Sequence, residues 1–301
     1  MTFFLGIDGG GSKTSCLLGD ETSVLGSGTG SGSNVVRVGE ASARKSLSEA
    51  IYQACSAANI SPSQISRTCV GVAGGARKDV DEIVRAIVSK IVGGEIEVVG
   101  DMVIALQAAF GDGPGVIVIA GTGSIAYGRN SNGETARAGG WGFAISDEGS
   151  GHWVGRAAIQ AIMRAYDEGK QTRLLASILN AWQLETRDQL ILSVNAIPSP
   201  DFSALFPMII SAAASDDALA KQILADAGDK LSGLAKIVVR RLFHPGQAVK
   251  IAMVGGVFAN SGIVREAFWK SLTVEYSNSD VDPRVVEPVR GALELARKRK
   301  A

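Results

Sequence analysis

The chain has 301 residues, of which 46% are hydrophobic and 20% charged, and its 30 basic residues balance its 30 acidic ones. This composition predicts a globular protein with one large or two ordinary domains and a substantial core. Because the formal net charge is zero, nucleic acid and anionic membranes are excluded as main partners.

The cysteines and the distribution of apolar residues indicate in which cellular compartment the protein is expected. The three cysteines, Cys16, Cys55 and Cys69, form no CxxC pair and are odd in number, which indicates a reducing environment. Gly6 and Asp8 interrupt the N-terminal apolar run, so no secretory segment is expected. No stretch approaches the ~20 apolar residues of a membrane helix. We therefore predict a cytoplasmic protein.

The chain opens on a predicted β-hairpin, residues 3–20, with a glycine-rich turn. The apolar strand ends in Asp8, the segment GGGSKT follows, and residues 14–19 read as a second strand. Three glycines let the backbone adopt positive φ and bring several N–H groups close to a ligand, and such a nest of N–H groups holds an anion. Asp8, at the strand tip, is placed to hold a cation or a metal-bound water.

Two commoner phosphate motifs do not fit this turn. Ser12 displaces Lys13 by one residue from the P-loop position, and a dinucleotide-binding GxGxxG would open a helix rather than a strand. A hairpin turn without function is the alternative.

A second hairpin repeats the first about a hundred residues later. Residues 116–128, VIVIAGTGSIAYG, again form an apolar strand, a glycine-rich turn with hydroxyls and a second strand. The repetition indicates an internal duplication in which two lobes could clamp a nucleotide triphosphate. The segment GDGPG, residues 111–115, is the predicted boundary between them.

The other predicted elements alternate between strands and helices. Strands are expected at residues 22–27, 69–73, 96–99, 134–138, 249–254 and 272–276, with a loop at 28–34. Helices are expected at residues 40–58, 79–91, 102–110, 152–166, 202–213, 216–242, from about 259, and 291–300.

Asp101 directly follows a predicted strand, where ligands bind in α/β sheets. It is a candidate general base, and a helix N-cap is the alternative. Asn34 ends a flexible loop, as a candidate ligand or a turn residue.

The segment 139–151, GGWGFAISDEGSG, predicts a ligand-binding loop, with a helix-capping acid as the alternative. The turn Gly255-Gly256 suits a nucleotide base or ribose, or is an ordinary close-packed turn. The two histidines, His152 and His244, do not predict a metal site.

Together these motifs resemble the sugar kinases of the actin-like ATPase superfamily, in particular the N-acetylglucosamine kinase and BadF/BadG/BcrA/BcrD ATPase family. The resemblance spans nearly the whole chain. It implies an α/β fold, a two-lobed actin-like ATPase of duplicated ribonuclease H-like domains, with a nucleotide cleft between the lobes. The implied lobes are residues 1–112 and 113–286, with a terminal helix at about 287–301 packing back on the first lobe.

The resemblance also implies the site residues. Asp101 would be the catalytic base and would contact the sugar, and Asp8 would organise Mg²⁺ through water. The ATP-binding residues would be Gly10, Gly11, Ser12, Lys13, Thr14, Gly121, Thr122, Gly123, Gly255 and Gly256. The sugar-binding residues would be Asn34, Ser124, Gly140, Trp141, Gly142 and Asp147.

The implied function is ATP- and Mg²⁺-dependent phosphorylation of an amino sugar, first of all the 6-hydroxyl of N-acetylglucosamine, by a homodimer. Residues 143–146 depart from the pattern of the animal enzymes, so glucosamine kinase stays open. An ATPase activator of a dehydratase would need cysteines at iron–sulfur spacing. A sugar-sensing repressor would need a DNA-binding module before the first hairpin, and a filament protein would have no use for the loop at 139–151.

Overall fold

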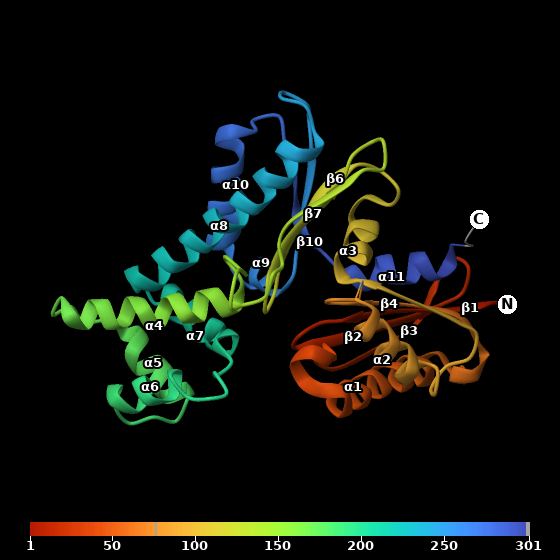
Figure 1. Cartoon of the computed structure of the whole chain (residues 1–301), viewed down its shortest axis with the longest axis horizontal. Helices are drawn as coiled ribbons and strands as arrows, with labels where there is room; N and C mark the ends of the chain where they lie inside the picture. Colours follow the sequence, from red (N-terminus) through yellow and green to blue (C-terminus); the bar gives the residue numbers. More distant parts are fainter. Residues whose placement is uncertain (76, 299–301) are drawn as a thin grey trace. The chain divides into compact units, whose positions relative to one another are not determined.

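The computed structural model describes residues 1–75 and 77–298. The chain divides into two compact units, each built on a five-stranded sheet (Figure 1). Unit 1 contains residues 1–117 and the end of the chain from Val286, and unit 2 contains Val118–Val285. The predicted two-lobed α/β fold is confirmed. The predicted borders at 112 and 286 stay a prediction, and residues 299–301 of the predicted terminal helix lie outside the described residues.

The elements of unit 1 begin with a three-stranded meander and end with the last helix of the chain. They are β1 (Phe3–Gly9), β2 (Lys13–Gly19), β3 (Val24–Ser31), α1 (Val35–Ala58), η1 (Pro62–Gln64), β4 (Ile65–Val72), α2 (Lys78–Val88), β5 (Glu95–Gly100), α3 (Asp101–Phe110) and α11 (Pro288–Arg297).

The second sheet starts with β6 (Gly115–Ala120), which begins just before the division between the units. Its other strands are β7 (Ser124–Arg129), β8 (Thr135–Gly139), β9 (Lys250–Val254) and β10 (Asp280–Val286). The accompanying helices are α4 (Gly151–Asp167), α5 (Arg173–Ala181), α6 (Arg187–Val194), η2 (Phe202–Leu205), α7 (Phe206–Ala214), α8 (Ala218–Leu242), α9 (Gly256–Asn260) and α10 (Gly262–Glu275).

The two sheets have the same strand order. The first reads β3-β2-β1-β4-β5, and the second, taken from its other edge, reads β8-β7-β6-β9-β10. In both, the first strand of the repeat is central and the meander lies to one side. This correspondence supports the internal duplication inferred from the two hairpins.

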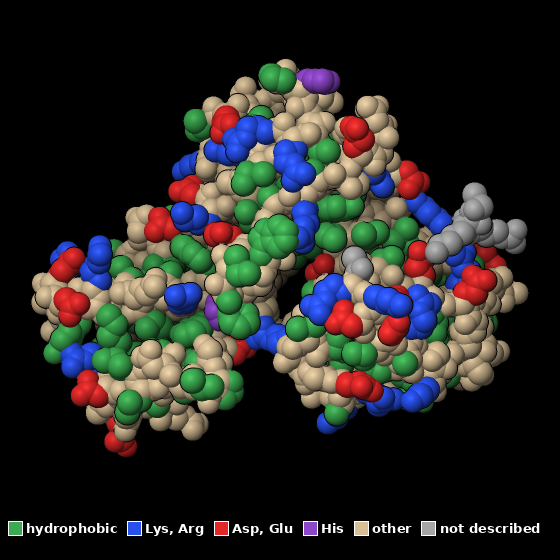
Figure 2. Space-filling model, in the orientation of Figure 1, with side chains coloured by type: hydrophobic (Ala, Val, Ile, Leu, Met, Phe, Trp, Pro, Cys, Tyr) green, Lys and Arg blue, Asp and Glu red, His purple; other side chains and the backbone are tan. Residues whose placement is uncertain are grey.

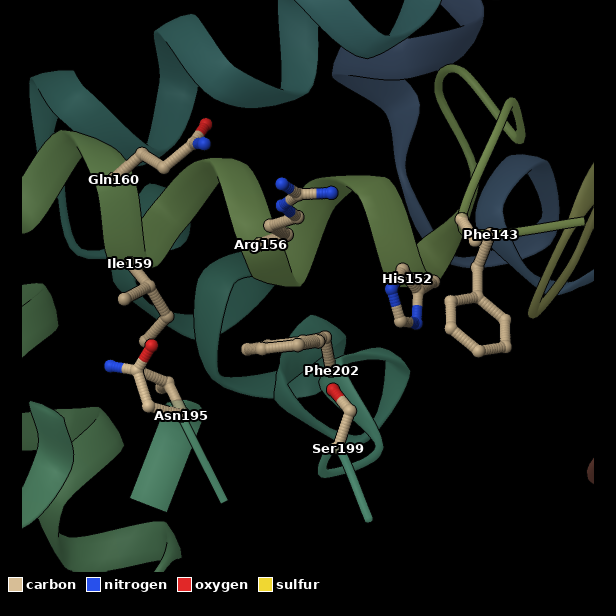
Figure 3. A pocket seen from close by; sticks show the side chains of 10 residues that line it. Phe143, His152, Arg156, Ile159, Gln160, Asn195, Ser199 and Phe202 are labelled. Atoms are coloured by element: carbon tan, nitrogen blue, oxygen red, sulfur yellow. The ribbon is translucent and has the colours of Figure 1, made fainter. Parts of the chain in front are cut away.

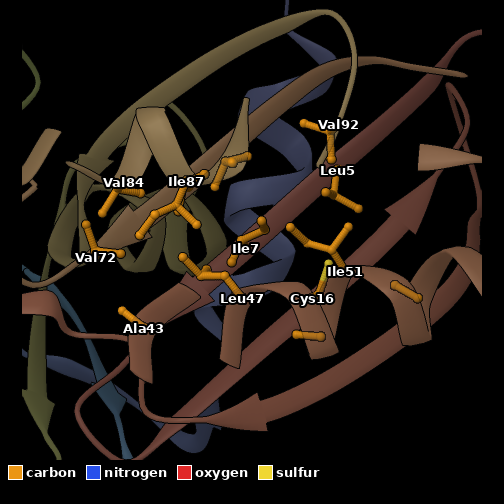
Figure 4. Packing of buried hydrophobic residues seen from close by; sticks show 14 of the residues in the cluster. Leu5, Ile7, Cys16, Ala43, Leu47, Ile51, Val72, Val84, Ile87 and Val92 are labelled. Carbon is orange, nitrogen blue, oxygen red and sulfur yellow. The ribbon is translucent and has the colours of Figure 1, made fainter. Parts of the chain in front are cut away.

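The sheet of unit 1 buries both of its faces. Because side chains alternate along a strand, Leu5 and Ile7 of β1 point to one face and Phe4 points to the other. The first face packs against α1 and α2 (Figure 4), and the second packs against α3 and α11. The central strand is therefore apolar on both sides up to Asp8, which lies one residue before the end of the strand.

Strand β3 is longer than predicted, because the glycines taken for a loop belong to it. The strand runs to Ser31, and Gly26, Gly28 and Gly30 fall on one face by their spacing of two. A Cβ on Gly28 would lie 2.0 Å from the carbonyl oxygen of Ala50 in α1. The glycines allow α1 to lie directly on the strand, so the predicted loop at 28–34 shrinks to residues 32–34.

The predicted last strand, residues 272–276, is wrong. This segment is the end of α10, whose Val264, Phe268 and Leu272 are buried at a spacing of four residues. Helix α10 packs on α8. The last strand is instead β10, whose only partly buried, charged sequence hides the alternation that sequence reasoning depends on.

The basic end of the chain is not simply solvated. The Arg297 guanidinium donates to the carbonyl oxygens of Asp20 and Ser23, both at 2.7 Å, and ties α11 to the β2–β3 turn. Lys298 donates to the carboxylate of Asp112 at 2.7 Å. The rest of the basic run, residues 299 and 300, lies outside the described residues.

The surface drawn in Figure 2 shows basic and acidic side chains interspersed rather than gathered by sign. This agrees with the balanced composition and offers no basic face on this side for a polyanion. Among residues 1–75 and 77–298, no helix combines the length and apolar character needed to span a bilayer.

Two glycines of α8 test the packing account. A Cβ on Gly228 would lie 2.6 Å from the carbonyl oxygen of Val264 in α10, whereas one on Gly233 would meet nothing within 4 Å. Gly233→Ala should stabilise the protein by about 0.5–1 kcal/mol through helix propensity. Gly228→Ala should destabilise it by about 1–3 kcal/mol through overpacking. Urea unfolding of both variants measures the difference, and equal stability changes would contradict the close helix contact.

Candidate functional site

The first glycine turn joins β1 to β2 and differs from the expected anion nest. Gly9, Gly10 and Gly11 are not in the left-handed region, so the turn does not use the positive φ that glycine allows. What demands glycine is close approach, because a Cβ on Gly9 would lie 2.7 Å from the Ser33 hydroxyl. The Gly10 N–H donates across the turn to the carbonyl oxygen of Lys13 at 3.0 Å. The Ser12 and Lys13 residues beyond it are exposed.

Asn34 is brought to this turn by backbone hydrogen bonds. The N–H groups of Ser33 and Asn34 donate to the carbonyl oxygen of Gly10 at 3.1 and 3.3 Å. The Asn34 side chain accepts from the Val36 N–H at 3.1 Å and caps α1. The turn-residue alternative therefore describes part of its role, and sugar binding by Asn34 stays a prediction.

Thr14, expected beside the phosphates, is buried. Its hydroxyl donates to the carbonyl oxygen of Ser31 at 2.7 Å and lies 2.8 Å from the Ser33 hydroxyl. These contacts hold the loop at 32–34 against β2. The geometry favours a positioning role for Thr14, and its direct contact with a ligand stays a prediction.

Asp8 and Asp101 face the same edge of the unit 1 sheet. Strands β1, β4 and β5 are parallel neighbours, Asp8 lies near the end of β1, and Asp101 begins α3 directly after β5. Asp101 is not the N-cap, which is Gly100; its carboxylate accepts from the Met102 N–H at 2.9 Å. This bond fixes the orientation of the carboxyl group.

Burial makes both carboxyl groups reluctant to ionise. Desolvation raises the pKa of Asp101 above its ordinary value. Desolvation, and then the charge of Asp101, raise the pKa of Asp8 to about 7, while the Lys13 ammonium acts in the opposite direction. Without a bound cation, both carboxyl groups ionise with difficulty. A cation bound beside them would stabilise their ionised forms, so the site favours cation binding.

The second glycine turn, between β6 and β7, is held by the start of α4. The Gly121 N–H donates across the turn to the carbonyl oxygen of Gly123 at 3.0 Å. The Gly151 N–H donates to the carbonyl oxygen of Gly121 at 2.8 Å, and the His152 N–H donates to that of Thr122 at 3.3 Å. The first amides of α4 are thus used to fix the turn.

The loop at 139–150 is bonded to the same turn. The Asp147 carboxylate accepts from the Ser124 N–H at 3.1 Å, and the Ser124 hydroxyl donates to the carbonyl oxygen of Glu148 at 2.8 Å. Desolvation raises the pKa of Asp147, which the hydrogen bond from Ser124 opposes. Both residues are buried. Their roles as sugar ligands stay predictions, whereas their role in joining loop to turn is observed.

The first half of the loop exposes large side chains. Gly139, Gly140 and Gly142 have φ of 73°, 70° and 90°, which only glycine adopts readily. Between them Trp141 is 60% exposed, and the Arg137 guanidinium lies 3.9 Å from its ring centroid. The glycines therefore force an indole outward, where it can stack on a ligand.

The late glycine turn lies against the second one. Gly255 has φ 99°, and a Cβ there would lie 2.5 Å from the carbonyl oxygen of Ala120. The end of β9 consequently meets the end of β6. Gly255 is thereby placed beside Gly121, and binding of adenosine by Gly255 and Gly256 stays a prediction.

An open pocket of about 420 Å³ lies beside the loop, within unit 2 (Figure 3). Phe143 forms one end and stacks on His152, with ring centroids 4.8 Å apart. Arg156 of α4 and Asn195 after α6 also line it. Nothing local in residues 170–200 marks a site; only the fold brings the end of α6 to α4.

The described residues limit what metal chemistry is possible. They contain no cluster of three or more His, Cys, Asp or Glu side chains suited to a metal. Asp8 supplies hard oxygen donors, so it suits a Mg²⁺ that takes its other ligands from phosphates and water. The three cysteines form no disulfide and are all buried, which places no thiol at the surface for a cluster shared between subunits.

Asp8→Asn tests the buried acid. Since the folded-state pKa is about 7 against an ordinary 3.8, the wild type should lose stability as pH rises from about 4 to about 7. The amide cannot ionise, so without Mg²⁺ the variant should be more stable than wild type at pH 8 by up to about 4 kcal/mol, and equal to it near pH 4. Urea unfolding at both pH values measures this. Asp229→Asn, at an exposed position, controls for the lost charge, and a variant less stable than wild type at pH 8 would refute the assignment.

Comparisons with known proteins agree with this geometry. The model of the BadF/BadG/BcrA/BcrD ATPase family matches residues 5–296. The chain is 32% identical to an N-acetylmuramic acid/N-acetylglucosamine kinase of Clostridium acetobutylicum, over 99% of each chain. It is 29% identical to an N-acetyl-D-glucosamine kinase of Dictyostelium discoideum, over 97% of each. The crystal structure of a proposed N-acetylglucosamine kinase from Chromobacterium violaceum shares the fold, with a TM-score of 0.75 at 23% identity over 98% of this chain and 99% of that one. The chain belongs to the BadF/BadG/BcrA/BcrD ATPase family.

Proposed function

We propose that this protein is an ATP-dependent kinase that phosphorylates the 6-hydroxyl of an amino sugar, N-acetylglucosamine first of all. The observation that carries the proposal is Asp101: a desolvated carboxylate with a fixed orientation, at the strand-end edge that also holds Asp8 and the first turn. The family and the sugar-kinase names of both curated relatives support it.

ATP would be held through backbone turns. Ser12 and Lys13 of the first turn and Thr122 of the second would contact phosphates, and Gly255 and Gly256 would face the adenosine. Asp8 would hold Mg²⁺ through a water, and the cation would neutralise phosphate charge. The raised pKa of Asp8 supports this role, because a bound cation would favour its ionised form.

The sugar would be held by side chains around the two turns. Asn34 lies against the first turn, and Asp147 lies against the second. Trp141, with Gly140 and Gly142, offers an exposed aromatic face of the kind that packs on a sugar ring. Ser124 would act mainly by holding Asp147 in place.

Asp101 would accept the proton of the attacking hydroxyl. Phosphoryl transfer depends chiefly on positioning and charge stabilisation, so the base is needed late, as the oxygen bonds to phosphorus. Burial raises its pKa, which strengthens it as a proton acceptor near neutral pH. A homodimer in the cytoplasm completes the proposal, on the strength of the family resemblance and of three cysteines that form no disulfide.

The Asp101→Asn variant is expected to fold normally and to lose sugar phosphorylation by roughly 10² or more, because the amide cannot accept the proton. ADP release with MgATP measures turnover, and circular dichroism checks the fold. Asp112→Asn, just beyond α3, serves as the matched control and should keep wild-type turnover. Near wild-type activity of Asp101→Asn would remove this residue from the role.

The acceptor is identified by the same assay with a panel of sugars. N-acetylglucosamine, glucosamine, glucose, N-acetylmannosamine and a blank without sugar separate the amino-sugar kinases from a sugar-independent ATPase. Strong turnover with N-acetylglucosamine supports the proposal. ADP release that ignores every sugar contradicts it.

A further inference from the structure

The pocket beside the loop has a lining that the proposed reaction at a 6-hydroxyl does not use. Its apolar part is formed by Phe143, Ile159, Val194 and Phe202. Its polar part consists of the Arg156 guanidinium, the side-chain amides of Gln160 and Asn195, and the Ser199 hydroxyl. At about 420 Å³ it has the size of a small-molecule site.

The charge in this pocket is one-sided. Arg156 is exposed on α4, and no Asp or Glu lines the pocket with it. Within the described residues, the Arg156 guanidinium forms no ion pair. An arginine without a carboxylate partner, above an apolar wall, suits a ligand carboxylate, since guanidinium binds that group through paired N–H donors.

The pocket also adjoins the proposed sugar loop. His152, which stacks on Phe143, donates its N–H to Thr122 of the second turn. Arg156 follows one helical turn later, about 6 Å farther along α4. Figure 3 shows His152, Arg156 and Ile159 on successive parts of this helix, with Phe143 and Phe202 from the adjoining segments. The cation therefore lies near the loop that carries Trp141 and Asp147, offset from the turn by a side chain's length.

From this we infer that the pocket receives an acidic substituent of the sugar, and that Arg156 binds its carboxylate. The substrate class is an N-acylated amino sugar that carries a short carboxylic acid through an ether oxygen, with the apolar wall contacting the substituent's methyl group. The inference rests on the proposed kinase function and extends it to a second, acidic sugar. N-acetylmuramic acid, named for the Clostridium acetobutylicum relative, has this chemistry and serves as the probe.

The test compares two sugars in two variants. Wild type is expected to phosphorylate both N-acetylmuramic acid and N-acetylglucosamine. Arg156→Ala should lower kcat/KM for the acidic sugar about tenfold or more, mainly through KM, because a hydrogen bond to a charged group is lost. The same variant should change kcat/KM for N-acetylglucosamine less than threefold, because this sugar has no carboxylate for Arg156 to bind. Arg156→Lys should keep part of the preference, since it retains the charge but not the paired donors.

Two controls isolate the charge. Arg164→Ala removes an exposed arginine farther along α4 that does not line the pocket, and should leave both sugars unaffected. The neutral amide of N-acetylmuramic acid has nearly the same shape, so its turnover should not respond to Arg156→Ala. An equal loss for both sugars in Arg156→Ala would overturn the inference by showing a structural role.

The remaining outcomes separate this inference from the function beneath it. If wild type turns over N-acetylglucosamine but not the acidic sugar, the inference fails and the kinase proposal stands. If no sugar is turned over, the kinase proposal fails. Calorimetric binding of N-acetylmuramic acid against its amide then still decides the pocket, because only a carboxylate site prefers the acid and loses that preference in Arg156→Ala.

Discussion

The structure depends on one hydrogen-bond pattern that occurs in both repeats. In each glycine turn a central glycine, Gly10 or Gly121, donates its N–H across the turn. The carbonyl oxygen of the same glycine accepts from the start of the following helix, from Ser33 and Asn34 before α1, or from Gly151 of α4. Each turn is thus fixed from behind by a helix that arrives after a third strand. Duplication explains why the pattern recurs, and it leaves the outer side of each turn for a ligand.

The second copy of the pattern carries an additional connection to the sugar loop. Ser124 bonds to both Asp147 and Glu148, so hydrogen bonds join the segment that would touch phosphate to the segment that would touch sugar. In the first copy, Asn34 holds a similar place, since its backbone is bonded to Gly10. Binding of either ligand would therefore order groups needed for the other.

The two acidic residues at the edge of the first sheet show that a site of this kind lowers the stability of the fold. Asp8 and Asp101 lie where burial opposes ionisation, and their mutual repulsion adds to that cost for Asp8. A protein selected for stability alone would hold neutral residues there. Residues that break the rules of a stable core in this way mark functional sites.

Much of the fold follows from local patterns, because apolar strands that end in glycine-rich turns are distinctive. Both hairpins, Asp101 after β5, and the loop with Trp141 were predicted this way. Features that depend on distant contacts were not. Gly28 looks like loop sequence until α1 lies on it. The end of α10 alternates like a strand until α8 covers its buried face. Arg156 has no local signal at all, since its pocket is completed by residues about 40 positions later.

The most direct test of the account is the ³¹P spectrum of the protein incubated with MgATP and N-acetylglucosamine. The account predicts ADP and, in equal amount, a phosphomonoester whose phosphorus couples to the protons of carbon 6. Inorganic phosphate in place of that ester would contradict it, because the two turns and Asp101 would then serve ATP hydrolysis rather than transfer to a sugar.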